Sequence, residues 1–279
     1  MNQATQLRQL LNQNQTLIAP GVFDGLSARL VEQCGFQVIY ASGGAIARST
    51  GVPDIGLLSL TEVRDQLADI VRVTNIPVVA DADTGFGNEI NVKRTIEEFE
   101  RIGVAGLHLE DQTFPKRCGH LDGKDLISTE DMCLKIKTAC AARTNKDLVI
   151  IARTDAIAVE GFDAAIARAN AYVNAGADMI FVEAPTSEQQ IETIAKQVPG
   201  YKLINMFHGG KTPMVPIEKL KTWGFQLVII PSDLQRAAIH AMQKTLNAIS
   251  ADGNSQSIAD ELASFAEREE IIRTKDYLK

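Results

Sequence analysis

Three acidic residues stand where two apolar runs of the sequence end. Asp81 and Asp83 are two residues apart, so on an extended strand their carboxylates point to the same side, and Glu110 ends the next run. Hard carboxylate oxygens suit Mg²⁺, with Mn²⁺ as an alternative, and no His/Cys cluster has zinc spacing. The pattern therefore predicts a magnesium site. A helix N-cap or a salt bridge would explain either aspartate taken alone.

The segment PKRCGH places a cysteine among cations. Cys118 is flanked by Lys116, Arg117 and His120. Neighbouring positive charge lowers the pKa of a thiol and makes proton exchange near neutral pH feasible. A lone cysteine is more often a buried hydrophobe, but this loop is rich in Gly, Pro and charge. We therefore interpret Cys118 as a functional residue.

Another apolar run ends in IIARTD, with Arg153 as its last residue. A guanidinium at this point could clamp a substrate carboxylate with two parallel hydrogen bonds, although an ion pair with Asp155 or Glu183 would also explain it. The same position at the end of other runs is taken by Tyr40, Glu183, Asn205 and Pro231.

The histidines outside this segment receive weaker interpretations. His108 shares the strand parity of Glu110, which predicts a hydrogen-bonded core histidine beneath the site. We interpret His240 as a packing or surface residue of a helix. His208 could reach a substrate from the loop that follows the seventh run.

Eight short apolar runs alternate with stretches of helical period, which is typical of βα units around a parallel sheet. The runs are residues 16–19, 38–41, 78–82, 106–110, 149–153, 179–183, 202–205 and 227–230. Eight repeats without a GxGxxG fingerprint predict an α/β fold of the (β/α)8 TIM-barrel type, whose carboxyl strand ends converge on one face. We expect one barrel domain over residues 1–279, with 251–279 as a C-terminal helical extension.

Glycines and long connections mark where the repeats turn. Gly35, Gly103, Gly176 and Gly224 each follow a predicted helix where a left-handed C-cap is needed. Two connections, SGGAIARSTGVPDIGLLS and EDQTFPKRCGHLDGK, are long and lack helical period, so we expect loops that build the site. The tail predicts a turn, ADGNSQS, followed by one charged amphipathic helix through Arg273.

The bulk composition excludes several classes of function. The chain has 279 residues, 45% of them hydrophobic, and a formal charge of −7, which argues against broad nucleic-acid or anionic-membrane surfaces. No stretch resembles a signal peptide or a membrane span, so we expect a cytoplasmic protein. Four cysteines without a CxxC pair indicate reduced thiols.

The motifs SGG, DADTGFGN, EDQ, KRCGH, ARTDA and GGKTP together resemble those of the isocitrate lyase and phosphoenolpyruvate mutase superfamily, and the match runs from Pro20 to Pro231. KRCGH is typical of its lyase branch. The resemblance implies Mg²⁺-dependent cleavage of a carbon–carbon bond in a small 2-hydroxy di- or tricarboxylate, of 2-methylisocitrate or 2-alkylmalate type, through an enolate. It also implies a homotetramer with exchanged C-terminal helices.

The resemblance implies a role for each motif residue. Cys118 would donate a proton from a mobile loop, aided by Lys116, Arg117 and His120, while Asp81, Asp83 and Glu110 would hold the metal near Asp54. The substrate pocket would be formed by Tyr40, Ser42, Gly43, Gly44, Gly119, Arg153, Glu183, Asn205 and Pro231.

Two positions depart from the methylisocitrate lyase pattern. Phe207 and His208 replace the Thr-Glu of NMTEFG, and Ile230 and Asp233 replace a tyrosine and a serine around the last proline. Both changes lie where the distal carboxylate or alkyl group should bind. A carboxyphosphonoenolpyruvate phosphonomutase, an oxaloacetate hydrolase and a catalytically silent binding protein stay open as alternatives.

Overall fold

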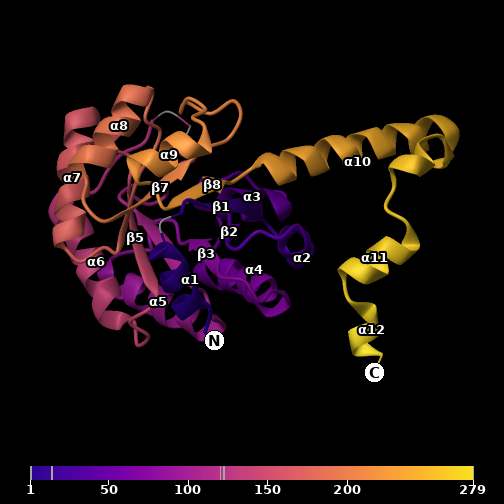
Figure 1. Ribbon diagram of the computed structural model, residues 1–279, viewed down its shortest axis with the longest axis horizontal. Coiled ribbons are helices and arrows are strands. Elements are labelled where there is room, and N and C mark those ends of the chain that lie inside the picture. The colour runs from indigo at the N-terminus through magenta and orange to yellow at the C-terminus, as the bar shows by residue number, and fades with distance from the viewer. Residues whose placement is uncertain (1, 14, 120, 122, 279) are drawn as a thin grey trace.

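The computed structural model describes residues 2–13, 15–119, 121 and 123–278, and its strands form a closed parallel barrel (Figure 1). Each strand pairs with the next, and the last pairs with the first. The predicted (β/α)8 fold is confirmed. The strands are β1 (Leu17–Val22), β2 (Ile39–Ala41), β3 (Val78–Asp81), β4 (Gly106–Glu110), β5 (Val149–Thr154), β6 (Met179–Val182), β7 (Tyr201–Asn205) and β8 (Leu227–Ile230).

Helices surround the barrel, and a helical tail follows it (Figure 1). They are α1 (Gln3–Leu11), α2 (Gly25–Gln33), α3 (Gly43–Ser49), α4 (Leu60–Val73), α5 (Glu89–Ile102), α6 (Thr129–Ala142), α7 (Phe162–Asn174), α8 (Glu188–Gln197), α9 (Ile217–Trp223), α10 (Asp233–Asp252), α11 (Phe265–Ile271) and α12 (Thr274–Tyr277), with 3₁₀ turns η1 (Ala156–Ala158) and η2 (Gln256–Glu261).

The turns after several helices depend on glycine, as predicted. Gly35, Gly103, Gly176 and Gly224 have φ values of 83°, 93°, 108° and 79°, in the left-handed region that costs glycine little. Each glycine lets its helix stop and the chain turn directly into the next strand.

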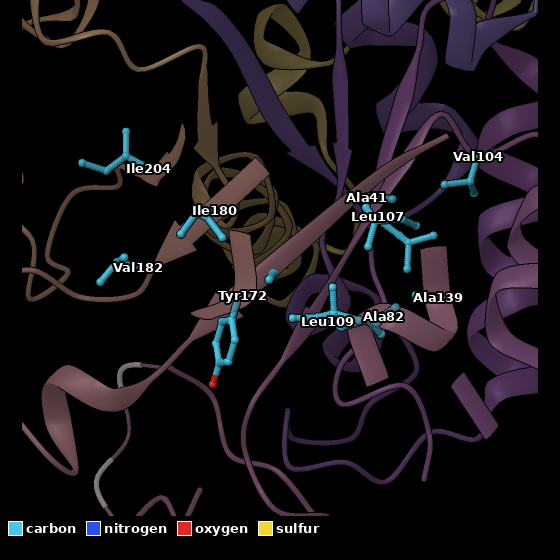
Figure 2. Packing of buried hydrophobic residues seen from close by; sticks show 14 of the residues in the cluster. Ala41, Ala82, Val104, Leu107, Leu109, Ala139, Tyr172, Ile180, Val182 and Ile204 are labelled. Atoms are coloured by element: carbon cyan, nitrogen blue, oxygen red, sulfur yellow. The ribbon is translucent and has the colours of Figure 1, made fainter. Parts of the chain in front are cut away.

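Alternation along the strands divides the apolar residues between two cores. Outward-facing side chains pack against the helices: Figure 2 shows Leu109 and Ile180 around Tyr172 of α7, in the same apolar cluster. Inward-facing side chains fill the barrel, and the buried leucines of α1 join them. Because apolar residues fill the barrel below them, the polar groups gather at its carboxyl end.

Three segments differ from the sequence-based expectation. β1 continues to Val22, beyond the predicted end at residue 19, since Pro20 and Gly21 are accommodated beside β8. A side chain at position 21 would place its Cβ 2.3 Å from the carbonyl oxygen of Pro231, so only glycine fits there. The first long connection contains the short helix α3, which Ser42 caps by accepting a hydrogen bond from the backbone of Ala45.

The tail is built from several short elements, so the prediction of one helix through Arg273 is wrong. Gly253, with φ of 72°, ends α10, and Ser264 caps the separate helix α11. In Figure 1, α10 projects away from the barrel, and Gln235 is its one buried residue among those described. In the described part of the chain, no helix has the length and apolar character needed to cross a membrane.

Candidate active site

A cavity of about 420 Å³ opens at the carboxyl ends of the strands. Its wall contains most of the residues that the sequence singled out, contributed by six strand ends and by the loop after β4. The predicted residues in the lining are Tyr40, Ser42, Gly44, Asp54, Asp81, Lys116, Cys118, Gly119, Arg153, Glu183, Asn205 and Pro231.

The acidic residues gather around one buried ammonium group. Lys116 forms an ion pair with Asp54, and its Nζ lies 2.7 Å from Oδ1 of Asp83. The sequence pattern placed Asp83 on the same strand as Asp81, but β3 ends at Asp81. A left-handed turn (φ 47°) positions Asp83 instead, and its backbone N–H donates to Oδ1 of Asp81 over 3.0 Å.

Burial and neighbouring charges shift the pKa values in this cluster in opposite directions. Burial raises the pKa of Glu110 well above its ordinary value and that of Asp83 to about 6. Burial opposes ionisation of Asp81 too, but His108, Lys116 and Arg153 hold its pKa well below the ordinary value. Burial also disfavours the charged form of Lys116, yet the carboxylates around it raise its pKa well above the ordinary value.

The cluster has the chemistry that Mg²⁺ prefers. Oε1 of Glu110 is buried without a hydrogen-bond partner among the described residues, and the other possible metal ligands around it are hard carboxylate oxygens. No three His, Cys, Asp or Glu side chains in the described ranges form a ready metal shell, and Lys116 lies against Asp83. Mg²⁺ binding by Asp81, Asp83 and Glu110 therefore stays a prediction, with Asp54 beside them.

Beneath the carboxylates, a buried hydrogen-bond network spans the barrel. The Tyr40 hydroxyl donates to Oδ2 of Asp81 over 3.2 Å and lies 2.9 Å from Nε2 of His108. His108 is fully buried, which lowers its pKa to about 4 and keeps the ring neutral at pH 7. His108 is thus a hydrogen-bonded core histidine, as its strand parity predicted.

Arg153 is held rigidly at the end of β5. Its Nε and Nη2 donate to the two oxygens of Asp155 over 2.9 and 3.1 Å, and its Nη1 lies 3.1 Å from Oε2 of Glu110. The guanidinium also lies over the ring of Phe181, 5.3 Å from its centroid. The alternative of a structural ion pair with Asp155 is therefore realised, while Arg153 still lines the cavity.

The loop after β4 brings the thiol to the cavity. Gln112 pairs with Leu126 at the base of this loop, and its side chain exchanges two hydrogen bonds with the backbone of Arg117. Cys118 is partly exposed and lines the cavity, and none of the cysteines in the described residues forms a disulfide. The Arg117 side chain is exposed, and His120 lies outside the described residues.

Glycines let the backbone approach the charged groups closely. A Cβ at Gly119 would lie 2.5 Å from Nη2 of Arg153, and one at Gly43 would lie 2.7 Å from Oδ2 of Asp81. Gly44 meets Asp54 in the same way, also at 2.7 Å. These contacts explain the glycines of SGG and KRCGH, because any larger residue would push the backbone away from the cavity.

The sequence patterns gave no pocket role to several lining residues, three of which stand on α10. Their spacing along α10 is helical and places them on one face, a signal that periodicity could have revealed. His208 is exposed, and its carbonyl oxygen accepts a hydrogen bond from Nη1 of Arg236 over 2.7 Å. Phe207, which the sequence placed at the distal end of the pocket, does line the cavity. The additional lining residues are Arg48, Phe181, Ile229, Ser232, Gln235, Arg236 and Ile239.

Known proteins resemble this chain over nearly its whole length. The phosphoenolpyruvate phosphomutase family profile matches residues 7–250. The chain is 41% identical over 273 residues to 2,3-dimethylmalate lyase of Eubacterium barkeri, covering 98% of this chain and 94% of that protein. It is 44% identical over 273 residues to 2-methylisocitrate lyase of Aeropyrum pernix, covering 98% and 88%.

Solved structures agree with these relatives. An oxaloacetate acetylhydrolase bound to 3,3-difluorooxalacetate has a TM-score of 0.94 and 35% identity, covering 99% of this chain and 95% of that one. Phosphonopyruvate hydrolase, solved with oxalate and Mg²⁺, has a TM-score of 0.90 and 31% identity, covering 99% and 97%. The chain therefore belongs to the PEP mutase/isocitrate lyase superfamily, and within it to the carbon–carbon lyase branch.

Proposed function

We propose that this protein is a Mg²⁺-dependent lyase that cleaves the C2–C3 bond of a small 2-hydroxy di- or tricarboxylate, of 2-alkylmalate or 2-methylisocitrate type. One observation carries the proposal: the carboxylates of Asp54, Asp81 and Glu183, the buried guanidinium of Arg153 and the Cys118 thiol line one cavity of about 420 Å³. The relatives that act as 2,3-dimethylmalate lyase and 2-methylisocitrate lyase support it.

The cavity lining suits a substrate with two carboxylates and an alkyl group. Arg153, held by Asp155, is positioned to bind the carboxylate next to the hydroxyl-bearing carbon. Arg48 and Arg236 add two further cations for a second carboxylate. Phe207 and Ile239 supply an apolar wall, which favours an alkylmalate.

The reaction needs a proton acceptor, a positive charge that stabilises developing negative charge, and a proton donor. The 2-hydroxyl loses its proton, for which Glu183 in the cavity wall is our candidate acceptor. The C2–C3 bond then breaks, leaving a 2-oxo acid and an electron pair on C3 of the other fragment. Cys118 gives that carbon a proton. A bound Mg²⁺ would supply positive charge against the negative charge that the 2-oxygen carries once it has lost its proton.

Product analysis tests this proposal directly. The enzyme is incubated with Mg²⁺ and, separately, with 2,3-dimethylmalate, 2-methylisocitrate, oxaloacetate and phosphonopyruvate. We expect a 2-oxo acid and a saturated carboxylate from one of the first two compounds. Turnover of oxaloacetate or phosphonopyruvate alone would contradict the proposal and assign a hydrolase or a mutase instead.

We also propose that the tail assembles the protein into a homotetramer with exchanged C-terminal helices. The projecting helix α10 carries an exposed apolar stripe, with Ile239, Met242, Leu246 and Ile249 between 42% and 64% exposed. Their spacing of three and four residues places them on one helix face, and such a stripe is typical of a protein interface.

The oligomeric state can be measured by size-exclusion chromatography with light scattering. We expect a tetramer for the wild type and smaller species for Met242→Glu with Leu246→Glu. Lys244→Glu, an exposed change on the same helix, is the control and should leave the tetramer intact. A wild-type monomer would contradict the assembly proposal.

A further inference from the structure

Lys124 links two parts of the site that lie far apart in the sequence. It follows Cys118 in the same loop, and 6% of the residue is exposed. Its ammonium donates a hydrogen bond to the carbonyl oxygen of Gly119 and forms an ion pair with Oδ1 of Asp155 at 3.0 Å. One end of this link is the loop that carries the thiol, and the other is the strand that carries Arg153.

The two cations share one carboxylate. Oδ1 of Asp155 accepts from Nη2 of Arg153 over 3.1 Å as well as from Lys124, while Oδ2 accepts from Nε of Arg153 over 2.9 Å. Gly119 lies against the same guanidinium, because a Cβ there would be 2.5 Å from Nη2. Loop backbone, lysine, aspartate and arginine thus form one closed set of contacts.

The strand side of this set is firmly anchored. The backbone N–H of Asp155 donates to Oδ1 of Asp111 over 2.9 Å, and Oδ2 of Asp111 accepts from Thr154 and Tyr172, each over 2.7 Å. All of these groups are buried, so Asp155 has little freedom to move. Lys124 stands on the loop, so the lysine rather than Asp155 is the part that would move if the loop opened.

We propose that Lys124 is a positioning residue that holds the Cys118 loop closed over the cavity by joining Gly119 to Asp155, the partner of Arg153. The proposal rests on the proposed function, in which Cys118 supplies the proton. Loop closure and carboxylate binding become coupled, because the guanidinium of Arg153 and the ammonium of Lys124 share the carboxylate of Asp155. When the loop opens, the ammonium moves into water, which solvates it well.

The rate at which the Cys118 thiol is alkylated reports whether the loop is closed, and it can be measured without turnover. Iodoacetamide reacts with Cys118 in the presence of Mg²⁺, with and without oxalate, and peptide mass spectrometry separates Cys118 from the other cysteines. Oxalate is used at a concentration that saturates each variant, as measured by thermal shift. We expect oxalate to protect Cys118 in the wild type and in the control Lys137→Met, an exposed change on α6.

In Lys124→Met we expect the protection by oxalate to be lost. We also expect kcat to fall by about 10- to 100-fold, which corresponds to one hydrogen bond to a charged group, while KM changes less. Lys124→Arg keeps a cation and should restore part of the protection, which a merely structural role would not predict. Lys124→Gln keeps a neutral hydrogen-bond donor, so oxalate should protect its Cys118 less than in the wild type and more than in Lys124→Met. If Lys124→Met does not fold, the protection measured in Lys124→Gln tests the proposal.

If oxalate protected Cys118 as well in a folded Lys124→Met or Lys124→Gln variant as in the wild type, Lys124 would not hold the loop closed. This outcome is distinct from failure of the proposed function. Wild-type turnover by Cys118→Ser would remove the thiol from the chemistry, but the alkylation rates would still report whether Lys124 closes the loop.

Discussion

The site has two halves that differ in how they are held. Asp81, Glu110 and Arg153 stand at the ends of neighbouring strands and are 6%, 0% and 7% exposed, with hydrogen-bonded strands on both sides. Cys118 and Lys124 stand on a loop whose base is closed by the Gln112–Leu126 bridge, and Lys124 connects this loop to Asp155. Charge is therefore fixed at the strand ends, whereas the proposed proton donor stands on a loop.

This division suits a reaction that needs both a stable charge distribution and access for substrate. Fixed groups lose little orientation when substrate binds, so the electrostatic part of catalysis is ready beforehand. A loop can admit substrate, close, and exclude water while an intermediate is exposed. Lys116 belongs to the loop yet forms ion pairs with Asp54 and with Asp83, which follows β3, so it connects the two halves.

The largest effect should come from removing charge on the strand half. We expect Asp83→Asn to lose essentially all activity, and added Mg²⁺ should no longer raise the melting temperature, because an anionic oxygen ligand is gone. Asparagine tolerates the left-handed conformation of position 83, so the turn should survive. Activity and the Mg²⁺-induced thermal shift are measured side by side.

The control for this change is Asp65→Asn, which alters an exposed ion pair with Arg64. It should leave both measurements at wild-type values. An Asp83→Asn variant that kept the Mg²⁺-induced shift would show that the metal binds elsewhere.

The loop half should give the next largest effect. Serine is nearly isosteric with cysteine but far less acidic, so we expect Cys118→Ser to lower kcat by about 10²- to 10⁴-fold. Binding of Mg²⁺ and oxalate should stay close to wild type, because the strand half is untouched. Steady-state kinetics and thermal shift measure the two parts separately, with Cys133→Ser as the control. If the variant lost binding of Mg²⁺ and oxalate as much as it lost kcat, the strand residues and the loop residue would not have the separate roles proposed.

The sequence predicted the strand half well because its signal is local. A polar residue that ends an apolar run must lie at a strand end, and parallel strands in a barrel bring those ends together. Tyr40, Asp81, Arg153 and Asn205 all line the cavity for this reason. The alternation within β4 also placed His108 correctly in the interior.

The remaining features depend on contacts between segments that are distant in sequence. Lys116 stands next to the Cys118 segment, which suggested that it would acidify the thiol, but folding brings Asp54 and Asp83 to its ammonium. Lys124 and Asp155 are separated by 31 positions, so no local pattern joins them. The turn at Asp83 follows from its hydrogen bond to Asp81, which strand periodicity does not describe.

A smaller effect should appear in the stability of the interior beneath the strand half. Unfolded His108 binds a proton below its ordinary pKa of 6.5, whereas burial lowers the pKa of the folded residue to about 4. The free energy of unfolding therefore falls as pH decreases from 6.5 to 4. This difference in pKa corresponds to a loss of about 3 kcal/mol.

His108→Gln removes this titration while keeping a hydrogen-bonding group near Tyr40. Urea unfolding at several pH values between 7 and 4.5 gives the free energy for both proteins. We expect their difference to shrink as pH falls. A difference that is independent of pH would mean that His108 does not titrate as its burial indicates.

The smallest expected effect concerns the wall beyond both halves. Phe207 lines the cavity, whereas the side chain of His208 is exposed and does not line it in the described part of the chain. We expect Phe207→Thr to shift the ratio of kcat/KM for 2,3-dimethylmalate against 2-methylisocitrate by about tenfold toward the tricarboxylate, since lost apolar contact is worth roughly 1–3 kcal/mol. His208→Glu is the matched control, and its ratio should stay at the wild-type value. If His208→Glu changed the ratio of kcat/KM and Phe207→Thr did not, specificity would depend on the exposed part of the loop and not on the apolar wall. The distal end of the substrate would then lie closer to solvent than the cavity lining indicates.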